Sequence, residues 1–147
     1  MPWHTELAAL VRLGEQRKQV ALLMAAQASR NGQEKLDEVQ RLRQEITSPA
    51  PRLMPEFQLD RPRLFSRLRN VAVMQAHRAE VELHARGLEN DAQALYEQAA
   101  QRRAEASRHH ARREKFASCL SRMERERSRD RLRREENNIQ EAFTCQG

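Results

Sequence analysis

Apolar residues recur in alternating steps of three and four along the second half of the chain. From Leu64 this spacing gives one register of 23 positions that runs unbroken to Glu141. Beyond Met123 the apolar residues move to Leu132, Ile139 and Phe143, a change of phase typical of a stutter. A heptad pattern sustained over so many turns predicts a long coiled-coil helix that buries one narrow seam. Thirteen positions of the register are apolar: Leu64, Val71, Met74, Val81, Ala85, Leu88, Ala92, Leu95, Ala99, Ala106, Phe116, Leu120 and Met123.

Start and stop signals predict one helix over residues 4–46, a connector over 47–61 and a second helix over 62–143. Thr5 is a suitable N-cap for the first helix, and a run of prolines between 49 and 55 ends it. Asp60 followed by Pro62 is a start signal for the second helix. Gly14 and Gly32 each weaken the first helix by about 1 kcal/mol relative to Ala.

The expected fold is all-α: a single long antiparallel two-helix coiled-coil hairpin over residues 1–147, with a break near Gly87 as an alternative. If Ile46 lies opposite Leu64, Leu7 faces about Arg103 and the second helix overhangs by roughly 40 residues. A break near Gly87 would instead pair the first helix with the C-terminal one. The apolar patch of Trp3, Leu7 and Leu10 would then meet the C-terminal apolar residues. The pattern alone leaves both arrangements open.

Composition supports a thin helical seam and excludes a β-rich fold or a compact enzyme core. Ala, Glu, Lys, Leu and Arg supply 80 of the 147 residues, whereas Gly and Pro together number nine. Four of the thirteen apolar seam positions are Ala, so the seam buries little surface per turn. We therefore expect the hairpin to be marginally stable by itself and better ordered on a partner.

No constellation of residues predicts catalysis, and the protein is not expected to be an enzyme. The four glycines never approach a phosphate-binding loop. His109, His110 and Cys119 lack the spacing at which helical residues share a metal ion, so no metal or cofactor is expected. Cys119 and Cys145 form no CxxC pattern, which suggests a reducing compartment. With no signal peptide and no apolar run near 20 residues, we expect a cytoplasmic protein that does not insert into the membrane.

The net charge of +6 is concentrated in one block. Between Gln101 and Arg134 there are 13 Lys and Arg against 5 Asp and Glu. Three interpretations are open: a contact with acidic protein surfaces, a nucleic-acid interface, or a solvated helix face. A nucleic-acid interface is the least favoured, because few aromatic residues accompany the arginines. A basic coiled-coil nucleic-acid-binding protein is the alternative function.

Two segments carry a resemblance to a known family. The ending Arg133-Arg134-Glu135-Glu136-Asn137-Asn138-Ile139-Gln140-Glu141-Ala142-Phe143 and the opening Leu7-Ala8-Ala9-Leu10-Val11-Arg12-Leu13 resemble those of the type III secretion stalk proteins. This class includes flagellar FliJ, Yersinia YscO and the plant-pathogen HrpO. The likeness extends over the whole chain in architecture and composition, but the early, long connector departs from it.

The resemblance implies a role like that of the central stalk of a rotary ATPase. The terminal helices would insert into the hexameric secretion ATPase and promote its activity, and the far end would reach the export-gate protein at the inner membrane. Some members of the class also bind secretion chaperones, and such a protein serves a virulence or flagellar system. Position along the chain assigns the ATPase contacts to ten residues: Leu7, Leu10, Arg125, Arg127, Arg129, Arg131, Leu132, Arg133, Ile139 and Phe143.

Overall fold

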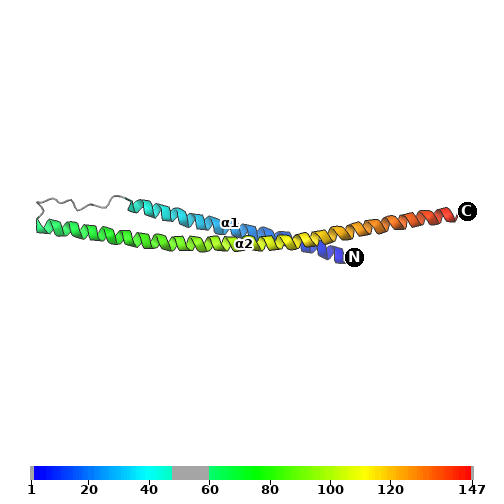
Figure 1. The fold of residues 1–147 in the computed structure, drawn as a ribbon, viewed down its shortest axis with the longest axis horizontal. Helices are drawn as coiled ribbons and strands as arrows, with labels where there is room; N and C mark the ends of the chain where they lie inside the picture. The colour runs from blue at the N-terminus through cyan, green and yellow to red at the C-terminus, as the bar shows by residue number, and fades with distance from the viewer. Residues whose placement is uncertain (1, 48–59, 147) are drawn as a thin grey trace. The chain divides into compact units, whose positions relative to one another are not determined.

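The computed structural model describes residues 2–47 and 60–146, and these form two helices (Figure 1). Helix α1 covers Pro2–Ile46 and helix α2 covers Arg61–Thr144, against the predicted ranges of 4–46 and 62–143. Most of the predicted connector, residues 48–59, lies outside the described residues. Arg61, which was assigned to the connector, is the first residue of α2.

Hydrogen bonds between residues close in sequence mark the beginning of α2 and the end of α1. The Asp60 carbonyl accepts a 3.0 Å bond from the Leu64 amide, so Asp60 caps α2 and Pro62 lies in its first turn. The Thr47 hydroxyl donates to the Gln44 carbonyl at 2.7 Å where α1 ends. The prediction that Thr5 caps α1 is wrong. Its hydroxyl donates to the Pro2 carbonyl at 2.7 Å, inside a first turn that already begins at Pro2.

The described residues group into two compact units, each combining part of α1 with part of α2. Unit 1 contains Met1–Leu23 and Arg102–Gly147, and unit 2 contains Met24–Gln101. In unit 1, His4 lies 3.1 Å from Glu124 and Glu15 lies 3.0 Å from Arg113. As residue numbers rise along α1 they fall along α2, so the helices are antiparallel.

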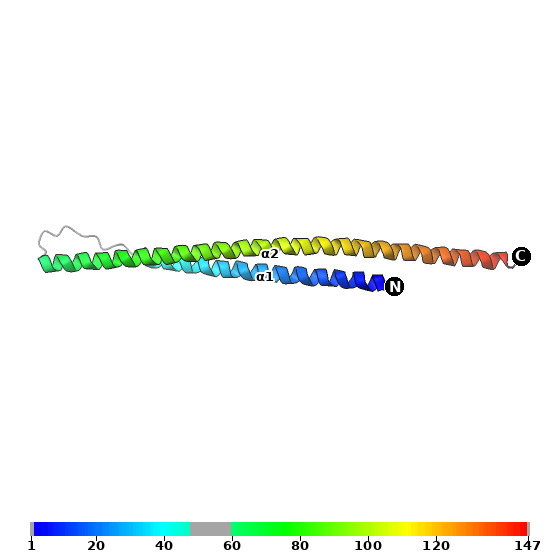
Figure 2. The same cartoon turned by 90° about the horizontal axis from the view of Figure 1, so that it is seen from below.

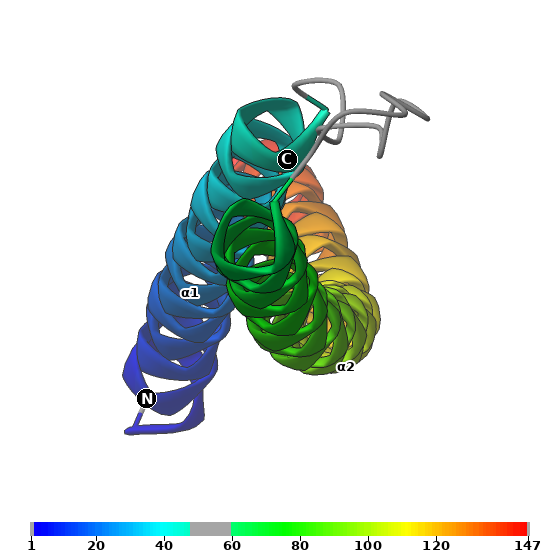
Figure 3. The ribbon, with the colours of Figure 1, turned by 90° about the vertical axis from the view of Figure 1, so that its left-hand side faces the viewer.

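Unit 2 has the same antiparallel pairing. Tyr96 donates a hydrogen bond to Gln33 at 3.2 Å, and Arg43 lies 3.3 Å from Glu82. Figures 2 and 3 show the cyan part of α1 beside the green part of α2 from two further directions. The predicted fold, an all-α antiparallel helical hairpin, is confirmed.

The seam predicted in α2 is the face that the structure buries. Ala85, Leu88, Ala92, Ala99 and Ala106 are buried, and every position of the predicted register from Arg78 to Met123 is at least half-buried. Outside this stretch the register is exposed at Leu64 and Met74. The matching seam of α1 is also made of small residues, with Val39 as its largest buried side chain: Ala21, Ala25, Ala28, Gly32 and Val39.

The longitudinal register differs from both predicted arrangements. Because His4 lies beside Glu124, Leu7 faces about residue 121 rather than Arg103. An alanine seam looks alike every three or four residues, so the pattern cannot choose among registers. The choice depends on side chains that fit only one register, such as Arg113 beside Gly14.

The predicted break near Gly87 is wrong, because α2 continues through this residue without interruption. Gly87 is exposed, whereas its neighbours Ala85 and Leu88 pack in the seam with Val39. Tertiary packing on either side of the glycine thus offsets its weak helix propensity.

Candidate functional site

The C-terminal segment of α2 is an exposed helix. All residues from Glu124 to Gln146 are exposed, and we refer to residues 124–144 as the tail helix. In Figures 1 and 2 the orange-to-red end of α2 continues past the N-terminal end of α1. Within unit 1, the described part of α1 reaches the tail helix at its first residue, where His4 lies against Glu124, and leaves the rest of it uncovered.

The tail helix has one apolar stripe. Leu132, Ile139 and Phe143 are 58%, 56% and 73% exposed, and their spacings of seven and four place them on one face. Leu132 follows Met123 by nine residues, about half a turn away from the seam. The stripe thus points away from the line along which α2 packs on α1, a larger shift than the predicted stutter produces.

The stripe does not meet the apolar residues of the N-terminus. Leu7 is half-buried in the seam, and Leu10 is exposed beside it. His4 lies against Glu124, so Leu132 to Phe143 lie beyond the start of α1. The sequence-based alternative in which the C-terminal apolar residues meet Trp3, Leu7 and Leu10 is therefore wrong.

The five predicted arginine contacts surround the tail helix rather than forming one face. Steps of two residues turn a helix by about 200°, so Arg125, Arg129 and Arg133 share one side and Arg127 and Arg131 another. All five are exposed. Arg125 and Arg129 precede Leu132 by seven and three residues, which places them on the apolar side. This side combines leucine, isoleucine and phenylalanine with two cations.

The whole net charge of the protein belongs to unit 1. Unit 1 contains 16 Lys and Arg against 10 Asp and Glu, whereas unit 2 contains 11 of each. In unit 1 the hydrogen bond from Gln19, together with Lys18 and Arg113, holds the pKa of Glu15 below its usual value. Unit 1 is thus the electrostatically positive part of the molecule.

Arg113 is the central charged residue of the paired part of unit 1. Its Nε lies 3.0 Å from Glu15 but is not aligned for a hydrogen bond. Its second donor, Nη1, bonds Glu114 at 2.6 Å. Beside it runs a groove between α1 and α2 that the sequence pattern did not predict. It is lined by Leu10, Leu13, Gly14, Arg17, His109, Arg112, Arg113 and Phe116. The sequence did contain a signal for this groove: Leu10 and Leu13 are apolar although they lie outside the seam of α1.

In unit 2, Arg43 of α1 pairs with Glu82 and Glu89 of α2, an arrangement that we call the Arg43 fork. Arg43 donates hydrogen bonds to Glu89 at 2.6 Å and to Glu82 at 3.3 Å. These bonds raise the pKa of Arg43, and Arg43 lowers the pKa of Glu82. The glutamates are seven residues apart on one face of α2, so one guanidinium joins two turns of α2 to α1.

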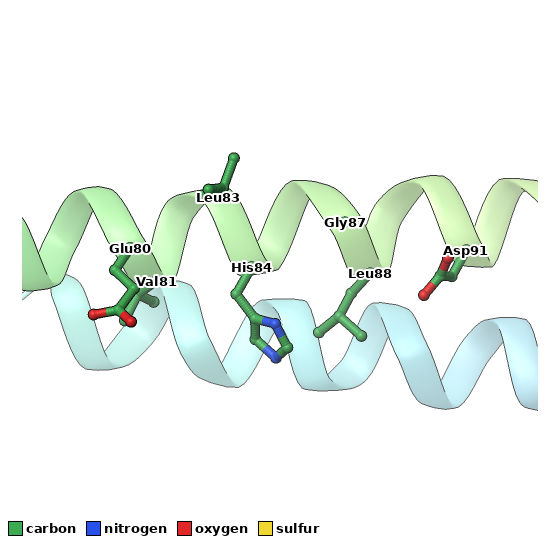
Figure 4. Close-up of a pocket in the computed structure, with 7 residues that line it drawn as sticks. All are labelled: Glu80, Val81, Leu83, His84, Gly87, Leu88 and Asp91. Carbon is green, nitrogen blue, oxygen red and sulfur yellow. The ribbon is translucent and has the colours of Figure 1, made fainter.

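A second groove follows α2 around Gly87 (Figure 4). Leu83 points away from α1, whereas His84 and Leu88 point toward it (Figure 4). A Cβ on Gly87 would meet no atom within 4 Å.

Among residues 2–47 and 60–146, no group of three or more His, Cys, Asp or Glu could hold a metal ion. In the same residues no helix is long and apolar enough to cross a membrane.

Comparisons with known proteins give one match. No curated protein and no solved structure matches this chain. The family model described as Salmonella surface presentation of antigen gene type M protein matches residues 5–143, which include most of α1 and nearly all of α2. The chain therefore belongs to the Salmonella surface presentation of antigen M family and is a component of a type III secretion system.

Proposed function

We propose that the protein is a central stalk of the secretion apparatus that docks into the hexameric export ATPase and promotes its activity. The tail helix carries this proposal, because it presents an unpartnered apolar stripe with adjacent cations. A helix of this kind gains most of its binding energy by placing residues four and seven apart into an apolar groove. The family membership supports a partner within the secretion apparatus.

In this proposal the tail helix enters the ATPase ring and unit 2 points toward the export-gate protein. The protein itself catalyses no reaction and acts in the cytoplasm at the inner membrane, where it also binds secretion chaperones. The neutral charge of unit 2 and the basic charge of unit 1 support different partners for the two units. Leu132, Ile139 and Phe143 are the proposed apolar ATPase contacts, Leu7 and Leu10 the proposed contacts from α1, and Arg125, Arg127, Arg129, Arg131 and Arg133 the electrostatic ones.

ATP hydrolysis by the export ATPase of the same secretion system tests the proposal. We expect the full chain to raise the hydrolysis rate and a chain lacking residues 132–147 to have no effect. Phe143→Ser should weaken the stimulation, since it removes the most exposed apolar contact of the stripe. Phe65→Ser is the matched control, because Phe65 is also on α2 and 65% exposed but belongs to unit 2. Equal effects of the two substitutions, or no stimulation by the full chain, would contradict the proposal.

A gel-shift assay with duplex DNA and RNA tests the alternative of a nucleic-acid-binding protein. The arginines of the tail helix alternate with Glu124, Glu126 and Asp130, which reduces its attraction to phosphates. We expect weak binding that disappears at moderate salt. Tight binding with a steep dependence on salt concentration would favour the nucleic-acid function instead.

A further inference from the structure

Helix α1 has two apolar seams that lie one residue apart. The first contains Leu7, Gly14 and Ala21 and packs against α2. Each residue of the second seam directly precedes a residue of the first seam, so the second seam has the same spacing of three and four. Within unit 1 its apolar residues are all exposed: Trp3, Leu10, Leu13 and Val20. Adjacent helical positions differ by about 100°, so the second seam is a separate face beside the first.

A second heptad seam implies a second helical neighbour. Surface helices of a two-helix hairpin need one apolar stripe, and exposed leucines normally occur singly. Here four large apolar residues keep heptad spacing over about five turns, broken only by Glu6 and Arg17. Within the described residues α2 covers this face only in part.

The groove beside Arg113 is where the second seam meets α2. Leu10 and Leu13 line it from α1, and Phe116 lines it from α2. Gly14 lies where the two helices come close together, since a Cβ on it would come within 3.1 Å of the Arg113 Cβ. The groove thus has apolar residues from both helices. A third helix could therefore touch both helices at once.

The charges of the groove determine what kind of helix fits. Arg17 and Arg112 line it from the two helices, and neither forms an ion pair with any described residue. Arg113 already lies between Glu15 and Glu114. The two free guanidinium groups thus call for carboxylates from the occupant.

We propose that this groove binds an acidic amphipathic helix of another protein, which lies along α1 and α2 as a third helix. Its apolar residues would pack on Leu10, Leu13 and Phe116, and its carboxylates would pair with Arg17 and Arg112. A second copy of this chain is a poor occupant, because it would bring another surplus of cations against the same arginines. The groove shares Leu10 with the proposed ATPase contacts but lies apart from the tail helix, and its test uses no ATPase, so this inference does not rest on the proposed stalk function.

A synthetic helical peptide of about three heptads, with Leu at the seam and Glu at the flanking positions, is the probe. Trp3, the only tryptophan, lies on the second seam, so a blue shift of its emission should accompany peptide binding. Fluorescence anisotropy of the labelled peptide gives the affinity. We expect a peptide with Lys in place of Glu to bind at least about ten-fold more weakly.

Variants of the full chain locate the binding. The pair Leu10→Ser and Leu13→Ser should weaken the acidic peptide by about ten-fold or more, as should the pair Arg17→Glu and Arg112→Glu. Leu23→Ser is the control, because Leu23 is 70% exposed on α1 but lies outside the groove. Circular dichroism melts show that each variant remains folded.

Three outcomes would overturn the proposal: no binding of the acidic peptide, equal binding of the two peptides, or an equal loss in Leu23→Ser. Sedimentation of the chain alone addresses the remaining occupant. If a dimer forms and Leu10→Ser with Leu13→Ser dissolves it, the groove binds a second copy instead of an acidic helix. None of these results depends on ATPase stimulation, which the tail-helix variants test by themselves.

Discussion

Gly14 of α1 lies against Arg113 of α2, so close that a Cβ on the glycine would stand 3.1 Å from the arginine Cβ. Gly32 of α1 has a similar position in unit 2, where an added Cβ would lie 3.3 Å from the ring of Tyr96. Both glycines are seam residues at which the helices approach each other. Gly87 differs, because an added Cβ would enter open space. Three helical glycines thus have two different structural roles.

The effect of replacing each glycine by alanine follows from this difference. Gly87→Ala should stabilise the protein by roughly 0.5–1 kcal/mol, since alanine is the better helix former and nothing obstructs its methyl group. Gly32→Ala should gain less, because the Tyr96 ring must move. Gly14→Ala should gain least or destabilise, because the Arg113 Cβ is fixed to the backbone. Thermal melts followed by circular dichroism would give this order, and a melting temperature highest for Gly14→Ala would contradict it.

The alanines of the seam set the distance between the helices. Ala99 is fully buried, so Ala99→Leu must push α1 away or adopt a strained rotamer. We expect a destabilisation of about 1–3 kcal/mol, although leucine stabilises most coiled-coil seams. The matched control is Ala94→Leu on the exposed side of α2, which should change stability by less than about 0.5 kcal/mol. Thermal or urea melts make the comparison, and a gain in stability for Ala99→Leu would show that the helices separate without cost.

The fork of Arg43 makes the stability of unit 2 depend on pH. Arg43 depresses the pKa of Glu82 below its ordinary value of 4.5. Glu82 therefore stabilises the folded state above about pH 4.5, and this contribution is lost as pH falls through the depressed pKa. In Arg43→Ala the melting temperature should be lower at neutral pH and fall less between about pH 5 and 3.

Arg41→Ala is the control for the fork. Arg41 is exposed on the same helix, and its replacement by alanine removes the same charge as Arg43→Ala. Its melting temperature should follow the pH dependence of the unmodified protein. If Arg41→Ala and Arg43→Ala flatten the pH dependence equally, the effect comes from net charge and not from the fork.

The tail helix should be dispensable for the stability of the hairpin. The two helices contain 129 residues, 45 in α1 and 84 in α2. Deleting residues 132–147 removes 13 of these helical residues, and none of the 13 is buried. The helical signal should fall by about a tenth, and the melting temperature should stay within about 2 °C. Deleting residues 2–13 removes a similar length but includes the seam residue Leu7, and it should lower the melting temperature. Equal losses in the two deletions would mean that the tail helix packs on the hairpin.

The sequence by itself determined which residues of α2 face α1. Heptad spacing predicted the register from Leu64 to Glu141, and the structure buries the part of it from Arg78 to Met123, because only residues on one face of a helix can stay out of water together. Start signals such as Asp60 and Pro62 located the beginning of α2, since helix ends depend on neighbours along the chain.

Only the tertiary structure decided the register, the continuity of α2 at Gly87 and the position of the tail helix. A seam of repeated alanines permits many registers of nearly equal energy, and contacts between residues distant in sequence select one. Arg113 beside Gly14, and Arg43 between Glu82 and Glu89, are contacts of this kind. The register then fixes where α1 begins along α2, and so leaves Leu132, Ile139 and Phe143 without a partner in their own chain.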